Sequence, residues 1–359
     1  MSGPRIVIGA GGTAGHVVPA LAVADALRAD GAEVVFVGGE RAERELVPKA
    51  GYELHVLRVE PLPRSKPLKA AGAALTDAVA VRSASQLLGS LSPDAVLGAG
   101  GYVSGPVGMV AAMRRIPLVL MEADSHLGLT NRLLARFARR VCLSFPIEGR
   151  TGPRYRVTGR PVPAPATDRG AARARFGIDP AETCVLVFGG SQGAWSINQA
   201  SVEAFAGGGR AGIHVLHAAG ERDLPRLRAP GPHYDLRGYI SEFGDALLAS
   251  DLVVSRAGGS IFEIAAHGRP AVLIPYPYAT ADHQAFNARY MEDAGAALVI
   301  PDRELSGARL AHEVGSLLAD APRLGAMARA SAELARPDAA REVAAELLAG
   351  AGAARAAGQ

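Results

Sequence analysis

Ile6-Val-Ile-Gly-Ala-Gly-Gly-Thr-Ala-Gly15 begins the first half of the chain, and Val185-Leu-Val-Phe-Gly-Gly-Ser-Gln-Gly193 begins the second. In each stretch an apolar strand runs into a glycine-rich loop, and a helical pattern follows. Sheets of this kind bind their ligands at the carboxyl ends of parallel strands. Each half is therefore predicted to be a Rossmann-like, doubly wound α/β domain, and two such domains are expected to face each other across a deep cleft.

Short apolar runs alternate with helical patterns through the rest of the chain, which indicates parallel sheets covered on both faces. The predicted strands are Arg5–Gly9, Glu33–Gly38, Ala95–Leu97, Leu118–Met121, Val141–Ser144, Cys184–Phe188, Ile213–His217, Leu252–Ser255 and Ala271–Ile274. The predicted helices of the first half are Val17–Ala29, Ala42–Ala50, Leu68–Leu88 and Leu129–Ala138.

Length and composition agree with two domains. The chain has 359 residues, 49% of them hydrophobic, which is more than one core usually holds. A Pro- and Gly-rich stretch at 146–165 places the boundary near Gly159. We expect an N-terminal domain at 1–158, a C-terminal domain at 159–336, and at 337–359 a helix over 339–349 that could pack back on the first domain, followed by a frayed end.

Charge and cysteine content restrict the environment. The net charge of +3 is too small to indicate nucleic acid binding, although it fits an anionic ligand or membrane surface. The two cysteines, Cys142 and Cys184, form no CxxC pair, which favours a reducing compartment. No signal-peptide pattern precedes Ile6, and the uncharged stretch Ala95–Met113 contains five glycines and a proline, so it is predicted to be strand, loop and helix rather than a membrane span.

The first half carries several candidate site residues. Gly9-Ala-Gly-Gly-Thr-Ala14 fits a dinucleotide fingerprint, with Glu40 as a possible ribose ligand, so an NAD-binding protein is one alternative. His16 follows this loop and could take a proton from a hydroxyl. A second loop, Gly98–Gly105, could form an oxyanion cradle beside the first. Glu122 and Asp124 follow a strand and are interpreted as hydrogen-bonding groups.

The second half carries a complementary set. The loop Gly189–Gly193 lies at a predicted helix start and could stabilise a leaving phosphate. Arg256, a cation near Gly258 and Gly259, could stabilise the charge of the leaving phosphate. Glu263 could bind a ribose or only stabilise its own helix. Asp282 could cap the next helix, and Gln284 and Asn287 lie on one face of that helix, where a sugar could be recognised. No Asp-x-Asp occurs in the chain, so no metal site and no cofactor are expected.

The ordered set of these motifs resembles the MurG family of GT-B glycosyltransferases, of the family 28 type. The motifs are Gly11-Gly-Thr-Ala-Gly-His16, Gly100-Gly-Tyr-Val-Ser-Gly105, Gly189-Gly-Ser-Gln-Gly193, Ser255-Arg-Ala-Gly258 and Asp282-His-Gln-Ala-Phe-Asn287. The resemblance implies inverting transfer of N-acetylglucosamine from UDP-GlcNAc to undecaprenyl-diphosphate-linked muramyl pentapeptide. It also implies a peripheral place on the cytoplasmic face of the membrane, an anionic membrane surface as partner, and a possible association with other cell-wall synthesis proteins.

The resemblance also implies that the N-terminal domain lies on the acceptor and membrane side, that the C-terminal domain binds the UDP-sugar donor, and that single residues have defined roles. His16 and Glu122 are the candidate bases, with His16 preferred. The implied donor-binding residues are Thr13, Ala14, Gly15, Asp124, Ser191, Gln192, Ile240, Arg256, Gly259, Ser260, Ile261, Phe262, Glu263, His283, Gln284 and Asn287. The implied acceptor-binding residues are Gly11, Gly12, Gly100, Gly101, Tyr102 and Ser104.

Three departures from the family pattern affect these assignments. Asp124 stands where the family usually has an amide, and Arg160-Pro-Val-Pro163 replaces its Asn-Pro-Val-Arg, so the arginine near the uracil is missing. The segment Ser255–Glu263 is one residue shorter than the common form. Besides the NAD oxidoreductase, the remaining alternatives are a UDP-sugar 2-epimerase, a glycolipid-forming transferase and a non-catalytic nucleotide-sugar-binding module.

Overall fold

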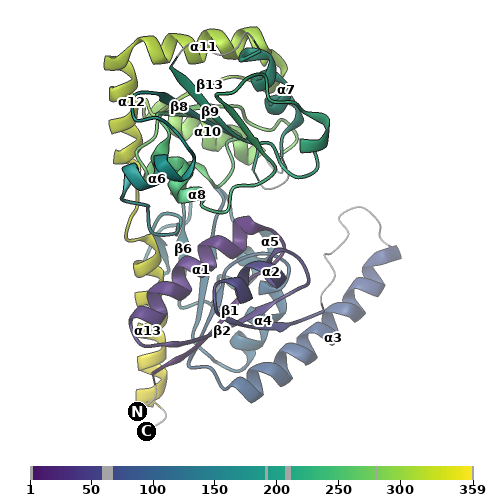
Figure 1. Cartoon of the computed structure of the whole chain (residues 1–359). Coiled ribbons are helices and arrows are strands. Elements are labelled where there is room, and N and C mark those ends of the chain that lie inside the picture. Colours follow the sequence, from purple (N-terminus) through teal and green to yellow (C-terminus); the bar gives the residue numbers. More distant parts are fainter. Residues whose placement is uncertain (1–2, 59–67, 191–192, 207–211, 280–281, 358–359) are drawn as a thin grey trace. The chain divides into compact units, whose positions relative to one another are not determined.

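The computed structural model describes residues 3–58, 68–190, 193–206, 212–279 and 282–357. The chain divides into two compact units, one formed by residues 1–163 with 336–359 and the other by residues 164–335. Each unit is built on one parallel sheet with helices packed against it (Figure 1).

The sheet of the first unit has seven strands in the order β3-β2-β1-β4-β5-β6-β7. Its strands are β1 (Arg5–Gly9), β2 (Glu33–Gly38), β3 (Glu53–Val56), β4 (Ala95–Gly98), β5 (Leu118–Glu122), β6 (Arg140–Leu143) and β7 (Tyr155–Val157). Its helices are α1 (Ala14–Ala29), α2 (Ala42–Lys49), α3 (Leu68–Leu91), α4 (Ser104–Met113), α5 (Leu129–Leu134) and α13 (Ala339–Ala357).

Alternation along the strands gives this sheet two cores. Ile6 and Ile8 of β1 belong to a cluster with α1 and α13, whereas Val7 belongs to a second cluster with α4 and α5. All three side chains are fully buried, because successive residues of a strand point to opposite faces. Apolar residues in unbroken runs are therefore needed here, as the sequence pattern predicted.

The C-terminal helix α13 belongs to the first unit. Val343, Ala344 and Leu347 pack into the cluster that contains α1, and burial of each large apolar side chain contributes about 1.5–3 kcal/mol. The helix continues to Ala357, so the expectation of a frayed end after residue 349 is wrong for residues 350–357. Its last turn is held by Arg355, which donates to the Asp94 carboxylate at 2.8 Å and to the carbonyl of Gly3 at 2.9 Å.

The sheet of the second unit has six strands in the order β10-β9-β8-β11-β12-β13. Its strands are β8 (Thr183–Phe188), β9 (Ile213–Ala218), β10 (Tyr234–Arg237), β11 (Leu252–Ser255), β12 (Ala271–Leu273) and β13 (Ala297–Val299). Its helices are α6 (Arg169–Arg175), α7 (Trp195–Ala204), α8 (Phe243–Ala249), α9 (Ile261–Ala266), α10 (His283–Asp293), α11 (Gly307–Ala319) and α12 (Ala321–Glu333), with short 3₁₀ turns at Leu224–Arg226 and Asp302–Glu304.

In both sheets the order of strands reverses between two neighbours. The reversal lies between β1 and β4 in the first unit and between β8 and β11 in the second. Loops leave a switch point in opposite directions and so open a crevice at the carboxyl ends of the strands, where open α/β sheets bind ligands. The four glycine-rich loops singled out in the sequence follow these four strands.

The uncharged stretch Ala95–Met113 forms β4, a loop and α4, as predicted. In the part of the chain that the structure describes, every helix is too short or too polar to cross a bilayer.

Candidate functional site

The two glycine loops of the first unit touch through their backbones. Gly9 and Gly98 are paired at the ends of β1 and β4, so their loops start side by side. A Cβ on Gly101 would lie 1.9 Å from the carbonyl oxygen of Gly11, and Gly101 has a φ of +78°. Only glycine avoids both the clash and the strain. The two loops implied in acceptor binding therefore form one surface.

Glu43, a residue that the sequence interpretation missed, joins these loops. It lies fully buried on α2. One carboxylate oxygen accepts from the Gly12 amide at 2.9 Å; the other accepts from the Gly39 amide at 2.7 Å and from the Tyr102 hydroxyl at 3.3 Å. The Gly12 amide is thus already paired with an anion, which argues against a phosphate cradle at this position, for an acceptor as much as for NAD. Glu40, the expected ribose ligand, is exposed.

Ser104 fixes the second loop. Its hydroxyl accepts from the Gly100 amide at 2.9 Å and lies 2.7 Å from the carbonyl oxygen of Gly9, to which it can donate. Ser104 is fully buried. It therefore ties the loop after β4 to the end of β1 and is a structural member of the set implied in acceptor binding.

His16 lies in the first turn of α1, against the second loop. A Cβ on Gly100 would lie 2.6 Å from its Nδ1, which among the described residues has no hydrogen-bond partner although it is buried. Burial, followed by the positive charge of Arg160, lowers the pKa of His16 below its usual value, while Asp124 and Glu43 oppose that shift. A neutral imidazole with an unpaired nitrogen can act as a base.

Arg160 holds the region around His16 together. It is buried, and its guanidinium donates to the carbonyl oxygens of Gly15 and Ala123. Arg160 stands where the family pattern has an asparagine. Within the first unit, it braces the start of α1 against the loop after β5.

The second candidate base, Glu122, is engaged on both oxygens. It accepts from the Asp124 amide at 3.1 Å, from the Gly128 amide at 2.9 Å and from the Asn131 side chain at 2.9 Å. Burial raises the pKa of this carboxyl, against the hydrogen bonds that lower it. These contacts organise the loop before α5, which leaves His16 as the better placed base.

In the second unit, Arg256 is buried and turned toward the protein. It pairs with Asp302 and donates to Ser196 Oγ at 2.9 Å and to the carbonyl oxygen of Ile274 at 3.2 Å. It thereby fastens the ends of β11 and β12 to α7. Such a committed guanidinium is a poor candidate for the cation at a leaving phosphate, the role that the sequence suggested.

The residues expected to contact the sugar divide into two kinds. Asn287 is buried and donates to the carbonyl oxygen of Ala257 at 2.9 Å, so it is structural. Gln284 is half-buried, and its Oε1 accepts from the Tyr276 amide at 2.9 Å, which fixes the orientation of the amide group. Glu263 is half-buried in the first turn of α9, and Gly259 and Ser260 precede it.

The other predicted residues lie in loops or at helix starts, within their own units. Thr13, Ala14, Gly15 and Asp124 belong to the first unit. Ile240, Ile261, Phe262 and His283 belong to the second, where Ile240, Ile261 and Phe262 are buried. Ser191 and Gln192 lie outside the described residues.

Two family models match the chain: the glycosyltransferase family 28 N-terminal domain over residues 6–143 and the glycosyltransferase family 28 C-terminal domain over residues 184–343. The chain belongs to glycosyltransferase family 28. The resemblance seen in the motifs and the GT-B fold class are thereby confirmed.

Curated relatives of this glycosyltransferase match it over nearly its whole length. The UDP-N-acetylglucosamine--N-acetylmuramyl-(pentapeptide) pyrophosphoryl-undecaprenol N-acetylglucosamine transferase of Moorella thermoacetica is 40% identical over 355 residues, covering 93% of this chain and 96% of the relative. The transferase of the same name from Rubrobacter xylanophilus is 42% identical over 334 residues, covering 91% and 98%.

Solved structures agree on the fold. The crystal structure of Acinetobacter baumannii MurG matches with a TM-score of 0.73 and 27% identity, covering 96% of this chain and 98% of that one. A putative UDP-N-acetylglucosamine 2-epimerase from Listeria monocytogenes matches with a TM-score of 0.70 at 15% identity, covering 95% of each chain, and so shares the fold alone.

Replacement of Glu43 tests its role as a brace. Glu43→Gln keeps the shape but substitutes an NH₂ group for one acceptor, so the Gly12 or the Gly39 amide loses its partner. A buried donor left unpaired costs about 1–3 kcal/mol. Hydrogen–deuterium exchange at these two loops should accelerate by roughly tenfold to a hundredfold. Glu45→Gln, an exposed change on the same helix, is the control; equal protection in wild type and Glu43→Gln would contradict the assignment.

Proposed function

We propose that this glycosyltransferase moves N-acetylglucosamine from UDP-GlcNAc to the 4-hydroxyl of the muramyl sugar in undecaprenyl-diphospho-muramyl pentapeptide, a step of peptidoglycan synthesis. The observation that carries the proposal is 40% identity, over 93% of the chain, with a relative named for that reaction. The arrangement of His16 beside the joined glycine loops supports it.

The proposed chemistry is a single displacement. His16 takes the proton of the acceptor hydroxyl, and the oxygen attacks the anomeric carbon. The bond from that carbon to the diphosphate breaks, its electron pair leaves with UDP, and the configuration inverts. Because Arg256 is committed within the second unit, we assign the leaving charge to backbone amides at the starts of α7 and α9, the helices that follow β8 and β11.

Transfer is proposed to need neither a metal nor a cofactor, and product analysis tests this together with the function. The full-length enzyme should release UDP and form the disaccharide lipid in equal amounts, at the same rate with excess chelator. Donor alone should stay unchanged. Formation of an epimeric UDP-sugar without acceptor would instead establish the 2-epimerase alternative, and loss of turnover on chelation that returns with Mg²⁺ would contradict metal independence.

The pH dependence tests His16. Because burial lowers its pKa below 6.5, the ring stays neutral at pH 7 and the rate should fall only as the pH drops through that lowered value. His16→Ala should reduce turnover on the order of a hundredfold or more. It should also remove the fall in rate at acidic pH and leave donor affinity within about twofold. His126→Ala, on the loop after β5 of the same unit, is the control. If His16→Ala kept the fall in rate at acidic pH, His16 would be excluded as the base.

A membrane partner is proposed from the surface of the first unit. The basic residues Arg64, Lys66 and Lys69 could attract an anionic membrane, and of these Arg64 and Lys66 lie outside the described residues. The described surface offers another candidate: Leu129, Leu133 and Phe137 recur every four residues on α5 and the turn after it, and each is more than half exposed. Exposed apolar side chains beside cations are typical of proteins that lie on anionic membranes.

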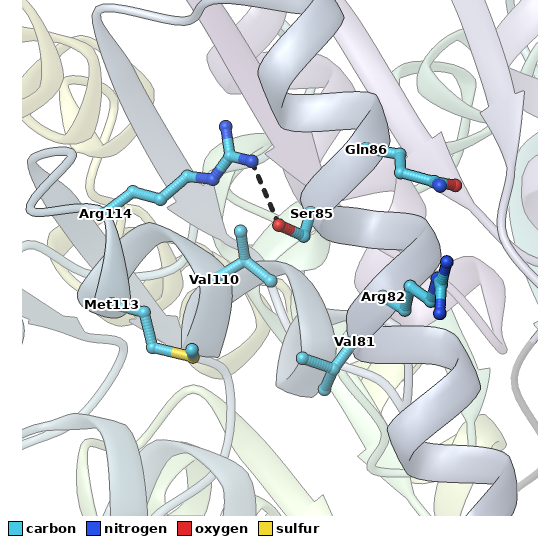
Figure 2. A pocket seen from close by; sticks show the side chains of 7 residues that line it. All are labelled: Val81, Arg82, Ser85, Gln86, Val110, Met113 and Arg114. Carbon is cyan, nitrogen blue, oxygen red and sulfur yellow. Dashed lines mark hydrogen bonds between the residues drawn. The ribbon is translucent and has the colours of Figure 1, made fainter.

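Helix α4, which packs beside α5, also carries exposed apolar side chains. Met109 and Met113 are 46% and 72% exposed. Figure 2 shows Val110 and Met113 of α4 opposite Val81 of α3, and these residues line a groove of about 490 Å³. Arg114, directly after α4, donates to Ser85 of α3 at 3.0 Å. Since the acceptor lipid stays in the bilayer, an apolar surface on the unit that carries His16 suits peripheral attachment.

Charge reversal tests this surface. Arg132 and Arg136 are exposed beside the apolar stripe of α5, and each cation near an anionic membrane contributes about 1 kcal/mol. Arg132→Glu with Arg136→Glu should therefore weaken binding to phosphatidylglycerol vesicles roughly thirtyfold or more. The matched control is Arg303→Glu with Arg341→Glu, at two exposed sites elsewhere. Equal vesicle binding by both double variants would place the membrane surface elsewhere.

A further inference from the structure

Two histidines and a glutamate gather at the edge of the second sheet that lies opposite the glycine loops. Glu182 directly precedes β8, His214 is the second residue of β9, and His233 directly precedes β10. These strands are neighbours in the order β10-β9-β8, and the Val215 amide donates to the carbonyl of His233 at 2.8 Å. Three adjacent strands thus bring the residues together at their amino ends.

The potential ligand atoms are close enough to share one ion. One nitrogen or oxygen atom of each residue lies within 4.8 Å of the other two. Nδ1 of His214 is 3.5 Å from Glu182 Oε2, and Nδ1 of His233 is 2.7 Å from Oε1. Two ligands that each lie about 2.0–2.1 Å from a tetrahedral zinc ion are about 3.3 Å apart, so only small side-chain rotations are required.

Two of the three side chains are held in place by the protein. Glu182 Oε2 accepts from the Asp179 amide at 3.0 Å, and the carbonyl oxygen of Glu182 accepts from Arg173 at 2.6 Å. The His214 side chain is 9% exposed, and its Nε2 has no hydrogen-bond partner among the described residues. Burial thus restricts the ring, and its Nδ1 lies toward Glu182.

We propose that Glu182, His214 and His233 form a binding site for a divalent transition metal, with Zn²⁺ as the natural probe. Two imidazoles and one carboxylate are a ligand set typical of zinc. Binding places the ion between His233 Nδ1 and Glu182 in place of their hydrogen bond, and the neutral imidazole then carries its one proton on Nε2. The His233 side chain is 62% exposed, so water completes the coordination.

The position of the site separates it from the proposed transfer reaction. The donor loops follow the carboxyl ends of β8 and β11, whereas these three residues stand at the amino ends of β8, β9 and β10. An ion here would link the edge strand β10 to β9 and β8 and stabilise the second unit. It would have no part in metal-independent chemistry, and the proposal does not depend on the identity of the sugar acceptor.

Calorimetric titration of the metal-stripped, full-length protein with ZnCl₂ tests the site. One ion should bind per chain, and saturating Zn²⁺ should raise the melting temperature. Two variants should each weaken zinc binding at least tenfold and abolish the rise in melting temperature. His233→Ala removes an exposed ring, and Glu182→Gln keeps an oxygen that can accept from the Asp179 amide. His312→Ala, an exposed histidine of the same unit, should bind as wild type does.

Two results would overturn the proposal. One is the absence of saturable binding by the wild-type protein. The other is equal affinity of wild type and His233→Ala, which would place the ion at other histidines. Turnover of the zinc-loaded and the stripped enzyme should agree within about twofold, and this comparison is independent of the affinity measurement.

Discussion

The backbone contact between Gly11 and Gly101 is the constraint on which the first unit depends. It arises because β1 and β4 are adjacent and parallel, so that the chain leaves both strands at one edge and turns in opposite directions. With no side chain at either position, the two loops close against each other and bring Gly100 against His16. Glu43 and Ser104 then fix the loops with hydrogen bonds, so the position of the candidate base follows from the packing of glycines.

The sequence predicted the central strands better than the edges of the sheets. β1, β4 and β8 are buried on both faces and therefore read as unbroken apolar runs. The missed strands β3, β7, β10 and β13 are three or four residues long, and all but β13 mix apolar with polar side chains, as in Tyr155–Val157. Such a segment is a strand because a neighbour offers it hydrogen bonds, which is information that local sequence does not contain.

The candidate site was predictable in its loops and less so in its side chains. Glycine density marks a close approach of the backbone, so the loops after β1, β4, β8 and β11 could be found from sequence. The direction in which a charged side chain points could not be found from sequence. Arg256 was interpreted as a phosphate ligand, yet its partners Asp302 and Ser196 are distant in sequence. Glu43 had one local signal, an acidic residue in the first turn of a helix, which usually indicates no more than a favourable helix dipole.

Glu43 also bears on how an anionic acceptor could approach these loops. A buried carboxylate that already accepts from the Gly12 amide and the Tyr102 hydroxyl makes the electrostatic potential beneath the loops more negative. Loop amides alone would then be a weak cradle for a diphosphate, and side-chain cations must supply the attraction. Arg41 is exposed, and its guanidinium lies 5.5 Å from the centre of the Tyr102 ring. In the arrangement we propose, the carboxylate orients the loops from within and Arg41, over the ring of Tyr102, supplies the positive charge, so that different residues bind the acceptor and brace the loops.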